Sequence, residues 1–205
     1  DLESYGKPLI FVDSNTLYLG HSCVTTDLED SVITALEHFL EQGHKEIGLL
    51  VGQEETADAT PLQMDPRQRT FQQFLTEKGL YEERFVSVGQ FSTESGYQMM
   101  EQLIQALGDD LPTAFFMASD ALAVGALRSL QEHQIAVPDR VSLISFNDTS
   151  IAKYVFPALS TVTVYTEEMG KQAIQMLRQT FQGTQPSVPY MVKLATKLTI
   201  RDSSR

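Results

Sequence analysis

Short polar or aromatic side chains follow the apolar runs of this sequence, and their types are those that a polyhydroxylated ligand requires. They are Asp13, the segment 52–67 that ends in an arginine, Phe91, the pair Ser119-Asp120 and the pair Asn147-Asp148. Carboxylate, amide and guanidinium groups are planar, so each can form two hydrogen bonds to vicinal hydroxyls. An aromatic face packs against the apolar C–H face of a sugar ring. Together these groups predict a sugar-binding site.

These side chains must be positioned by strands, because each of them follows an apolar run of the kind that forms a buried strand. Expected strands lie at 8–12, 47–51, 85–88, 113–118, 141–146 and 161–165. Segments with helical periodicity lie between them, at 28–40, 67–78, 92–107, about 122–130 and 167–182. This alternation predicts an α/β fold whose parallel sheet is covered on both faces. In such a sheet, ligands bind beyond the carboxyl ends of the strands.

Two smaller expectations concern the end of the chain and the single cysteine. Residues 190–200 should be extended, and 203–205 should be frayed. Cys23 is the only cysteine, which excludes an internal disulfide and mildly favours a cytosolic protein. It should be a small buried residue.

Composition limits the classes of function. The chain has 205 residues, 42% of them hydrophobic and 20% charged, which suits one large domain or two small lobes with a real core. Its net charge of −12 argues against nucleic-acid binding by these residues, because phosphate contact needs clustered cations. No apolar run reaches the roughly 18 residues of a membrane span, so no membrane partner is expected.

Signatures of catalysis are missing from the sequence. There is no glycine-rich phosphate loop, and Ser95-Gly96 lacks the second glycine of a nucleophile elbow. The histidines lack the spacing of metal ligands; they are His21, His38, His44 and His133. We therefore expect no enzyme, no cofactor and no metal site.

Each candidate residue also has a purely structural explanation. Asp120 is well placed to be the N-cap of a helix, and 147–149 could simply be a turn. Phe91 could belong to the core, Asp13 could form an Asx turn, and Arg67 could lie on a solvated helix face. The sugar-site prediction depends on the conjunction of these residues and not on any one of them.

Several motifs resemble the effector-binding domain of the lactose-repressor (LacI/GalR) family of bacterial transcription regulators. Residues 112–163 carry Ser119-Asp120, Val137-Pro138-Asp139, Phe146-Asn147-Asp148 and Pro157-Ala-Leu-Ser-Thr161 in the order that the family has them. The resemblance extends over essentially the whole chain, through the motifs at 8–13, 42–47, 67–71 and 89–96.

The resemblance implies a periplasmic-binding-protein-like fold, a doubly wound parallel sheet with its effector between two lobes. By that likeness the effector contacts are Asp13, Arg67, Phe91, Ser119 in place of a frequent Asn, Asp120 beside it, and Asn147 in place of a frequent Asp. The segments 145–149 and 157–166 resemble the galactose-operon and β-galactosidase-repressor branch, which suggests galactose or a galactoside. Three departures from the family pattern are Thr70, Ser145 and Asn147.

The same resemblance divides the chain into lobes. Residues 1–24 and 162–193 would form part of the N-terminal lobe, and residues 25–161 and 194–205 a complete C-terminal lobe. The family's DNA-binding helix-turn-helix is expected to be absent from this chain, so DNA would be a partner only through it.

The function implied is that of the sugar-sensing domain of a cytoplasmic transcriptional regulator. This regulator is expected to be a repressor that controls carbohydrate-utilisation genes. A homodimer is expected, with an interface that uses helix 122–130 and the loop 154–156, although Phe156 could instead be core. Two alternatives stay open on the sequence: a periplasmic or extracellular sugar-binding protein of a transporter, and an α/β enzyme with an unrecognised site.

Overall fold

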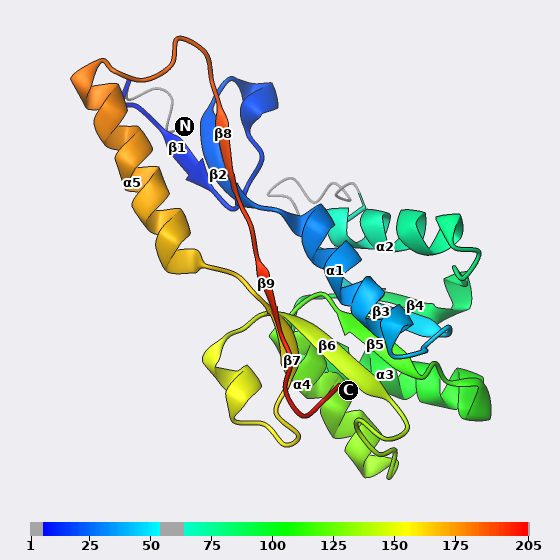
Figure 1. The fold of residues 1–205 in the computed structure, drawn as a ribbon. Helices are drawn as coiled ribbons and strands as arrows, with labels where there is room; N and C mark the ends of the chain where they lie inside the picture. Colours follow the sequence, from blue (N-terminus) through cyan, green and yellow to red (C-terminus); the bar gives the residue numbers. More distant parts are fainter. Residues whose placement is uncertain (1–5, 54–63, 205) are drawn as a thin grey trace. The chain divides into compact units, whose positions relative to one another are not determined.

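The computed structural model describes residues 6–53 and 64–204, and the chain divides into two compact units (Figure 1). Unit 1 consists of Asp1–Asp27 and Val164–Thr196, and unit 2 of Leu28–Thr163 and Lys197–Arg205. Both units are therefore built from separate stretches of sequence.

Unit 2 contains a six-stranded sheet in the order β4-β3-β5-β6-β7-β9. The strands are β3 (Ile47–Gly52), β4 (Val86–Gly89), β5 (Ala114–Met117), β6 (Ser142–Asn147), β7 (Ser160–Thr163) and β9 (Lys197–Thr199). All neighbours pair in parallel except β9, which runs antiparallel to β7. The chain steps from β3 outward to β4 and then back across to β5 and β6, so the predicted doubly wound parallel sheet is confirmed.

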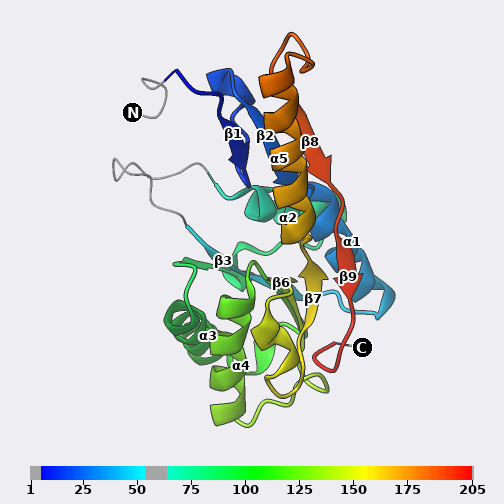
Figure 2. The same cartoon turned by 90° about the vertical axis from the view of Figure 1, so that its left-hand side faces the viewer.

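Helices cover both faces of this sheet (Figure 2). On one face α1 (Leu28–Glu41) packs against α2 (Pro66–Glu77), and on the other α3 (Thr93–Leu107) packs against α4 (Asp120–Glu132). The backbones of α3 and α4 approach closely, because a Cβ on Gly96 would overlap the backbone of Leu122 and one on Gly125 would overlap that of Thr93. Both faces being covered explains why β3, β5 and most of β6 are buried without alternation.

Unit 1 has a three-stranded parallel sheet in the order β1-β2-β8, formed by β1 (Ile10–Val12), β2 (Ser22–Thr26) and β8 (Met191–Leu194). Helix α5 (Thr166–Gln182) packs on β1 and β2, where Val24, Met169 and Met176 form the core. Cys23 is fully buried in β2 with a free thiol, as predicted. Strand β2 itself was not predicted, because Ser-Cys-Val-Thr-Thr is neither a long apolar run nor a clear alternation.

Residues 203 and 204 are ordered, which corrects the prediction that they are frayed; residue 205 of that prediction lies outside the described residues. Ser203 is fully buried and Ser204 is 5% exposed. The Ser203 hydroxyl donates to the Leu143 carbonyl over 2.7 Å and accepts from the Ser160 N–H over 2.8 Å. Residues 203–204 thus complete the region where β6 and β7 begin, a role that their polar side chains do not suggest from sequence.

Candidate functional site

The predicted site residues of unit 2 gather along the carboxyl edge of its sheet. Phe91 follows β4, Ser119 and Asp120 follow β5, and Asn147 ends β6. Because β4, β3, β5 and β6 are parallel neighbours, these ends lie on one edge. Asp13 follows β1 and belongs to unit 1. Of the loop 53–66, residues 54–63 lie outside the described part of the chain.

Arg67 reaches this edge from the first turn of α2 and is held there by Asp65. Asp65 is the N-cap of α2, and its Oδ1 accepts from the Arg67 backbone N–H over 2.8 Å. The same carboxylate accepts from the guanidinium twice, from Nε over 2.9 Å and from Nη2 over 2.7 Å. The two side chains are only 13% and 12% exposed, so Arg67 is not on a solvated helix face.

The guanidinium of Arg67 also joins α2 to strand β5 and contacts two aromatic rings. Its Nη1 donates to the carbonyl of Ala118 over 2.7 Å. Its central carbon lies 4.8 Å from the ring centre of Phe91 and 5.4 Å from that of Phe146, within the range of a cation–π contact. These contacts use one N–H on each nitrogen. Among the described residues, one N–H on each terminal nitrogen has no partner, so the guanidinium can still donate to a ligand.

Phe91 lies against Gly52, at the end of the neighbouring strand β3. A Cβ on Gly52 would overlap the Phe91 ring and would lie 2.7 Å from the Phe91 backbone nitrogen. A glycine at position 52 therefore allows the ring to lie across the end of the strand. Phe91 is partly exposed, so its side chain is accessible to a ligand.

Asn147 and Asp148 form a turn with an unusual backbone. Their φ angles are 108° and 57°, and Asp13 at the end of β1 has a φ of 62°. Non-glycine residues held at such angles cost on the order of 1–3 kcal/mol each, and they are common at ligand sites. Within residues 6–53 and 64–204 the side-chain amide of Asn147 forms no hydrogen bond, which leaves its donors and acceptor for a ligand.

Asp148 fixes this turn to the sheet. Its Oδ1 accepts from Nη2 of Arg201 over 2.7 Å, and its Oδ2 accepts from the Thr163 hydroxyl over 2.9 Å. The Asp148 N–H donates to the Thr161 hydroxyl over 3.3 Å. The strained turn is therefore stabilised from β7 and from the end of the chain.

Asp120 is not the helix N-cap that the sequence suggested. The N-cap of α4 is Ser119, whose hydroxyl accepts from the Leu122 N–H over 3.2 Å. Asp120 is 1% exposed, and its carboxylate accepts four hydrogen bonds from other strands and loops. The donors are the Ser145 hydroxyl at 2.5 Å, the Thr161 hydroxyl at 3.0 Å, and the N–H and hydroxyl of Thr149 at 2.6 and 2.8 Å. Asp120 thus joins α4 to β6, to β7 and to the loop after β6 through its hydrogen bonds.

Three residues of this arrangement were missed at the level of sequence. Asp65 precedes Pro66, and an aspartate followed by proline is a signature of a helix start that could have identified it. Phe146 was read only as part of a strand. Arg201 had no local signal, because its partner Asp148 is far away in the sequence.

The groups at this sheet edge can form hydrogen bonds to a polar ligand and pack against it. The edge offers a guanidinium, an amide, a hydroxyl and an aromatic face, and its buried carboxylates are already engaged by protein donors. In the described part of the chain, no cluster of three His, Cys, Asp or Glu residues could hold a metal ion. Nor does any described helix combine the length and apolar character needed to cross a membrane.

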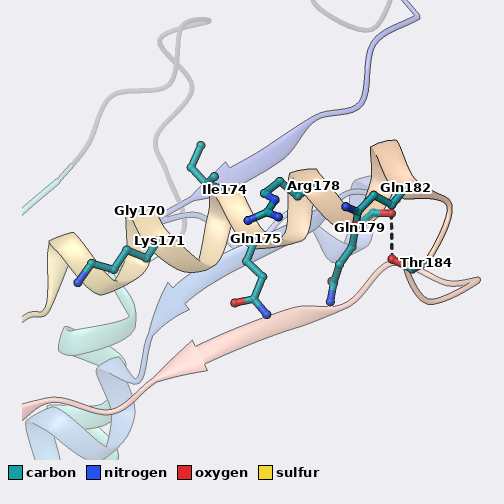
Figure 3. A pocket seen from close by; sticks show the side chains of 8 residues that line it. All are labelled: Gly170, Lys171, Ile174, Gln175, Arg178, Gln179, Gln182 and Thr184. Atoms are coloured by element: carbon teal, nitrogen blue, oxygen red, sulfur yellow. Dashed lines mark hydrogen bonds between the residues drawn. The ribbon is translucent and has the colours of Figure 1, made fainter.

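A separate open pocket of 760 Å³ lies in unit 1 along α5 (Figure 3). Its lining comes from α5 and the turn after it, and it contains none of the predicted site residues. Lys171, Arg178 and several glutamines line it, and Ile174 is 60% exposed. Gln179 is already engaged, since its Oε1 accepts from the Tyr190 hydroxyl over 2.9 Å. One helix and the turn after it supply all the lining groups, whereas the residues of the sheet edge come from several elements.

Comparisons with known proteins agree with this architecture. The profile of the periplasmic binding protein-like domain family matches residues 36–204. The HTH-type transcriptional regulator GalR of Streptococcus thermophilus is 51% identical over 204 residues, 100% of this chain and 61% of that protein. GalR of Lacticaseibacillus casei is 37% identical over 203 residues, 99% of this chain and 61% of that protein. The chain therefore spans 61% of the length of both regulators.

A solved structure of a transcriptional regulator matches the fold of this chain. The transcriptional regulator CelR in complex with cellobiose superposes with a TM-score of 0.85 at 26% identity, covering 98% of this chain and 60% of that one.

Proposed function

Because this chain belongs to the periplasmic binding protein-like domain family, in the branch of LacI/GalR-type regulators, we propose that it is the sugar-sensing part of a transcriptional regulator. The regulator acts as a repressor of carbohydrate-utilisation genes in the cytoplasm. DNA is contacted by another part of the protein, and the −12 net charge of these residues is consistent with that division.

The observation that carries the proposal is the arrangement around Arg67. A guanidinium fixed by Asp65 has, within residues 6–53 and 64–204, one N–H without a partner on each terminal nitrogen, and it lies beside a partly exposed phenylalanine ring. The Asn147 amide, which forms no hydrogen bond to these residues, lies on the same sheet edge. Vicinal hydroxyls above an apolar ring face match these groups, and a ligand without hydroxyls would leave them unpaired.

We take galactose or a galactoside as the effector class. Asn147 offers an amide where related domains often carry a carboxylate, so it both donates to and accepts from a hydroxyl and adds no charge. Both curated relatives are named GalR, which supports this choice. The effector contacts proposed are Arg67, Phe91, Ser119 and Asn147 from unit 2 and Asp13 from unit 1, with Asp120 holding the edge together.

Unit 2 corresponds to the C-terminal lobe of the effector-binding domain, and unit 1 to part of its N-terminal lobe. The effector shifts the regulator between two conformational states, because its contacts differ between them. The sugar is released chemically unchanged, since binding alone shifts the equilibrium.

The regulator is a homodimer, and the loop after β6 contributes to the interface. Tyr154 and Phe156 are 83% and 84% exposed, so Phe156 is not core. Gln131 on α4 donates to the Phe156 carbonyl over 2.6 Å, which joins the loop to the helix. Leu122 and Leu130 are fully buried within unit 2, so the interface uses the opposite side of α4. Sedimentation of the intact protein at tens of micromolar would reveal a monomer if this is wrong.

Titration calorimetry on the intact protein tests the proposed function. D-Galactose, methyl β-D-galactoside and lactose are titrated into wild type, R67A and N147A, with D-glucose as the epimer control. Each substitution should weaken binding about tenfold or more, since truncating a bidentate group costs on the order of 1–3 kcal/mol. Operator affinity without sugar should stay unchanged.

Three outcomes would overturn the proposal. Wild type that binds no sugar in the panel would remove the sugar-sensing function. Binding that survives both substitutions would place the site elsewhere. Recovery of a chemically altered sugar would point instead to an enzyme.

A further inference from the structure

The last described residues of the chain are fastened to the sheet at several points. Arg201 donates its N–H to the Ser160 hydroxyl over 2.8 Å, and its carbonyl accepts from the same hydroxyl over 3.2 Å. Ser203 is bound to Leu143 and Ser160, and its N–H donates to the Ala158 carbonyl over 3.0 Å. The backbone of Arg201 is thus fixed beside the beginning of β7.

From this fixed backbone the side chain of Arg201 connects β7 to the ligand edge. Nη1 donates to the Leu159 carbonyl over 2.7 Å, and Nη2 donates to Oδ1 of Asp148 over 2.7 Å. The Arg201 and Asp148 side chains are 17% and 10% exposed, so the ion pair is largely removed from water. A charge-assisted hydrogen bond in such a place is stronger than one at the surface.

Asp148 is the second residue of the turn whose first residue is Asn147, and both have a positive φ. A turn of two non-glycine residues in this region persists only when its surroundings hold it. The Asp148 carboxylate is held by Arg201 on one oxygen and by Thr163 on the other. Without Arg201, the charged half of that anchor is lost.

We propose that Arg201 is a positioning residue of the ligand site: through Asp148 it fixes the turn that presents the Asn147 amide, so sugar affinity and selectivity depend on the segment after β9. This inference rests on the proposed function in taking Asn147 as a ligand contact. Arg201 itself does not touch the ligand.

The test compares R201M, D148N and the double variant with wild type in the intact protein. D148N keeps the shape of the side chain and tolerates a positive φ, so it removes the charged pair without requiring the fold to change. Calorimetry with D-galactose should give about tenfold weaker binding for each single variant, and the double variant should be no weaker than the singles, because both remove one interaction. The ratio of the Kd values for D-galactose and D-glucose should fall toward one.

R140M is the matched control. Arg140 also donates to backbone carbonyls within unit 2, to those of Asp109, Leu111 and Pro112, and it lies just before β6, at the opposite edge of the sheet. It should lower stability without changing sugar affinity or selectivity. If R140M weakens binding as much as R201M, the effect is general destabilisation and the positioning role is wrong.

A measurement without sugar separates this inference from the proposed function. Amide hydrogen exchange at 147–149 should accelerate in R201M and D148N but not in R140M. Faster exchange together with unchanged galactose binding would overturn the positioning role while the sugar site stands. Wild type without galactose binding would overturn the proposed function, and unchanged exchange would then also overturn the anchoring of the turn.

Discussion

One carboxylate, that of Asp65, holds Arg67 at both its backbone and its side chain. Oδ1 accepts from the Arg67 N–H over 2.8 Å and from Nε over 2.9 Å, while Oδ2 accepts from Nη2 over 2.7 Å. The same carboxylate therefore caps α2 and fixes the orientation of the guanidinium. A change at position 65 can affect the ligand site without any contact between Asp65 and the ligand.

D65N separates these two roles. Asparagine is as good an N-cap as aspartate, so the start of α2 should persist and the free energy of unfolding should fall only through the loss of the buried ion pair, by about 1–3 kcal/mol. The amide cannot accept both guanidinium bonds, so galactose binding should weaken about tenfold. Urea unfolding and calorimetry measure the two effects. E132Q is the control, because it removes the partner of Arg128 in an exposed ion pair and should alter neither quantity.

G52A should displace Phe91. The added Cβ overlaps the ring, so stability should fall by about 1–3 kcal/mol and sugar binding should weaken with it. The control is G170A, at a helical glycine with open space around its Cβ position, which should raise stability by about 1 kcal/mol. Thermal unfolding measures the stability of both variants, and titration calorimetry measures their sugar affinity. A G52A protein with wild-type affinity would argue against Phe91 as a ligand contact.

N147G should weaken galactose binding and raise the free energy of unfolding. Glycine adopts a φ of 108° without strain, so unfolding should become up to about 1 kcal/mol less favourable despite the added chain entropy of glycine. The amide is lost, so galactose binding should weaken about tenfold, as in N147A. An N147G variant that is less stable than N147A would contradict the account of strain at this turn.

D120A should be among the most destabilising substitutions in unit 2. It leaves the buried hydroxyls of Ser145 and Thr161 without their acceptor, together with the N–H and hydroxyl of the more exposed Thr149, at a cost of about 3 kcal/mol or more. The free energy of unfolding from urea titration measures this loss. A change below about 1 kcal/mol would mean that water or other acceptors replace the carboxylate.

Stability should also depend on the ionisation of His44. Burial of the ring, and secondarily the nearby His38, lower the pKa of His44 below its usual 6.5. The unfolded chain then takes up a proton at a higher pH than the folded one, so stability is full above 6.5 and falls as the pH drops below it. H44Q should lose less stability than wild type between about pH 7.5 and about pH 5.5. Equal slopes would contradict the prediction.

Much of the fold follows from the sequence because the strands of unit 2 are buried on both faces. Such strands are continuous apolar runs, and β3, β5 and β6 were each predicted within two residues of their ends. Strand β2 was missed because three of its five residues are Ser or Thr. Residues 203 and 204 were misread for a similar reason: both are serines, yet they are buried and form hydrogen bonds to distant residues.

The sequence predicted that the site residues of unit 2 lie at one edge of the sheet, but not which of them bond to one another. Parallel strands bring their ends to one edge, so Phe91, Ser119 and Asn147 could be placed together from the pattern alone. The N-cap was assigned to Asp120 instead of Ser119, since either residue type caps helices and only the geometry distinguishes them. The pairing of Arg201 with Asp148 spans the fold, and no local pattern reports such a pair.

The discontinuity of the two units has a consequence for synthesis on the ribosome. The chain passes between the units after Asp27, after Thr163 and after Thr196. Strands β1 and β2 therefore emerge from the exit tunnel long before β8, which pairs with β2. Likewise β7 must wait for β9. Until β8 and β9 have emerged, β2 and β7 carry open sheet edges that can pair with other chains, so neither unit should resist protease before its last strand is in place.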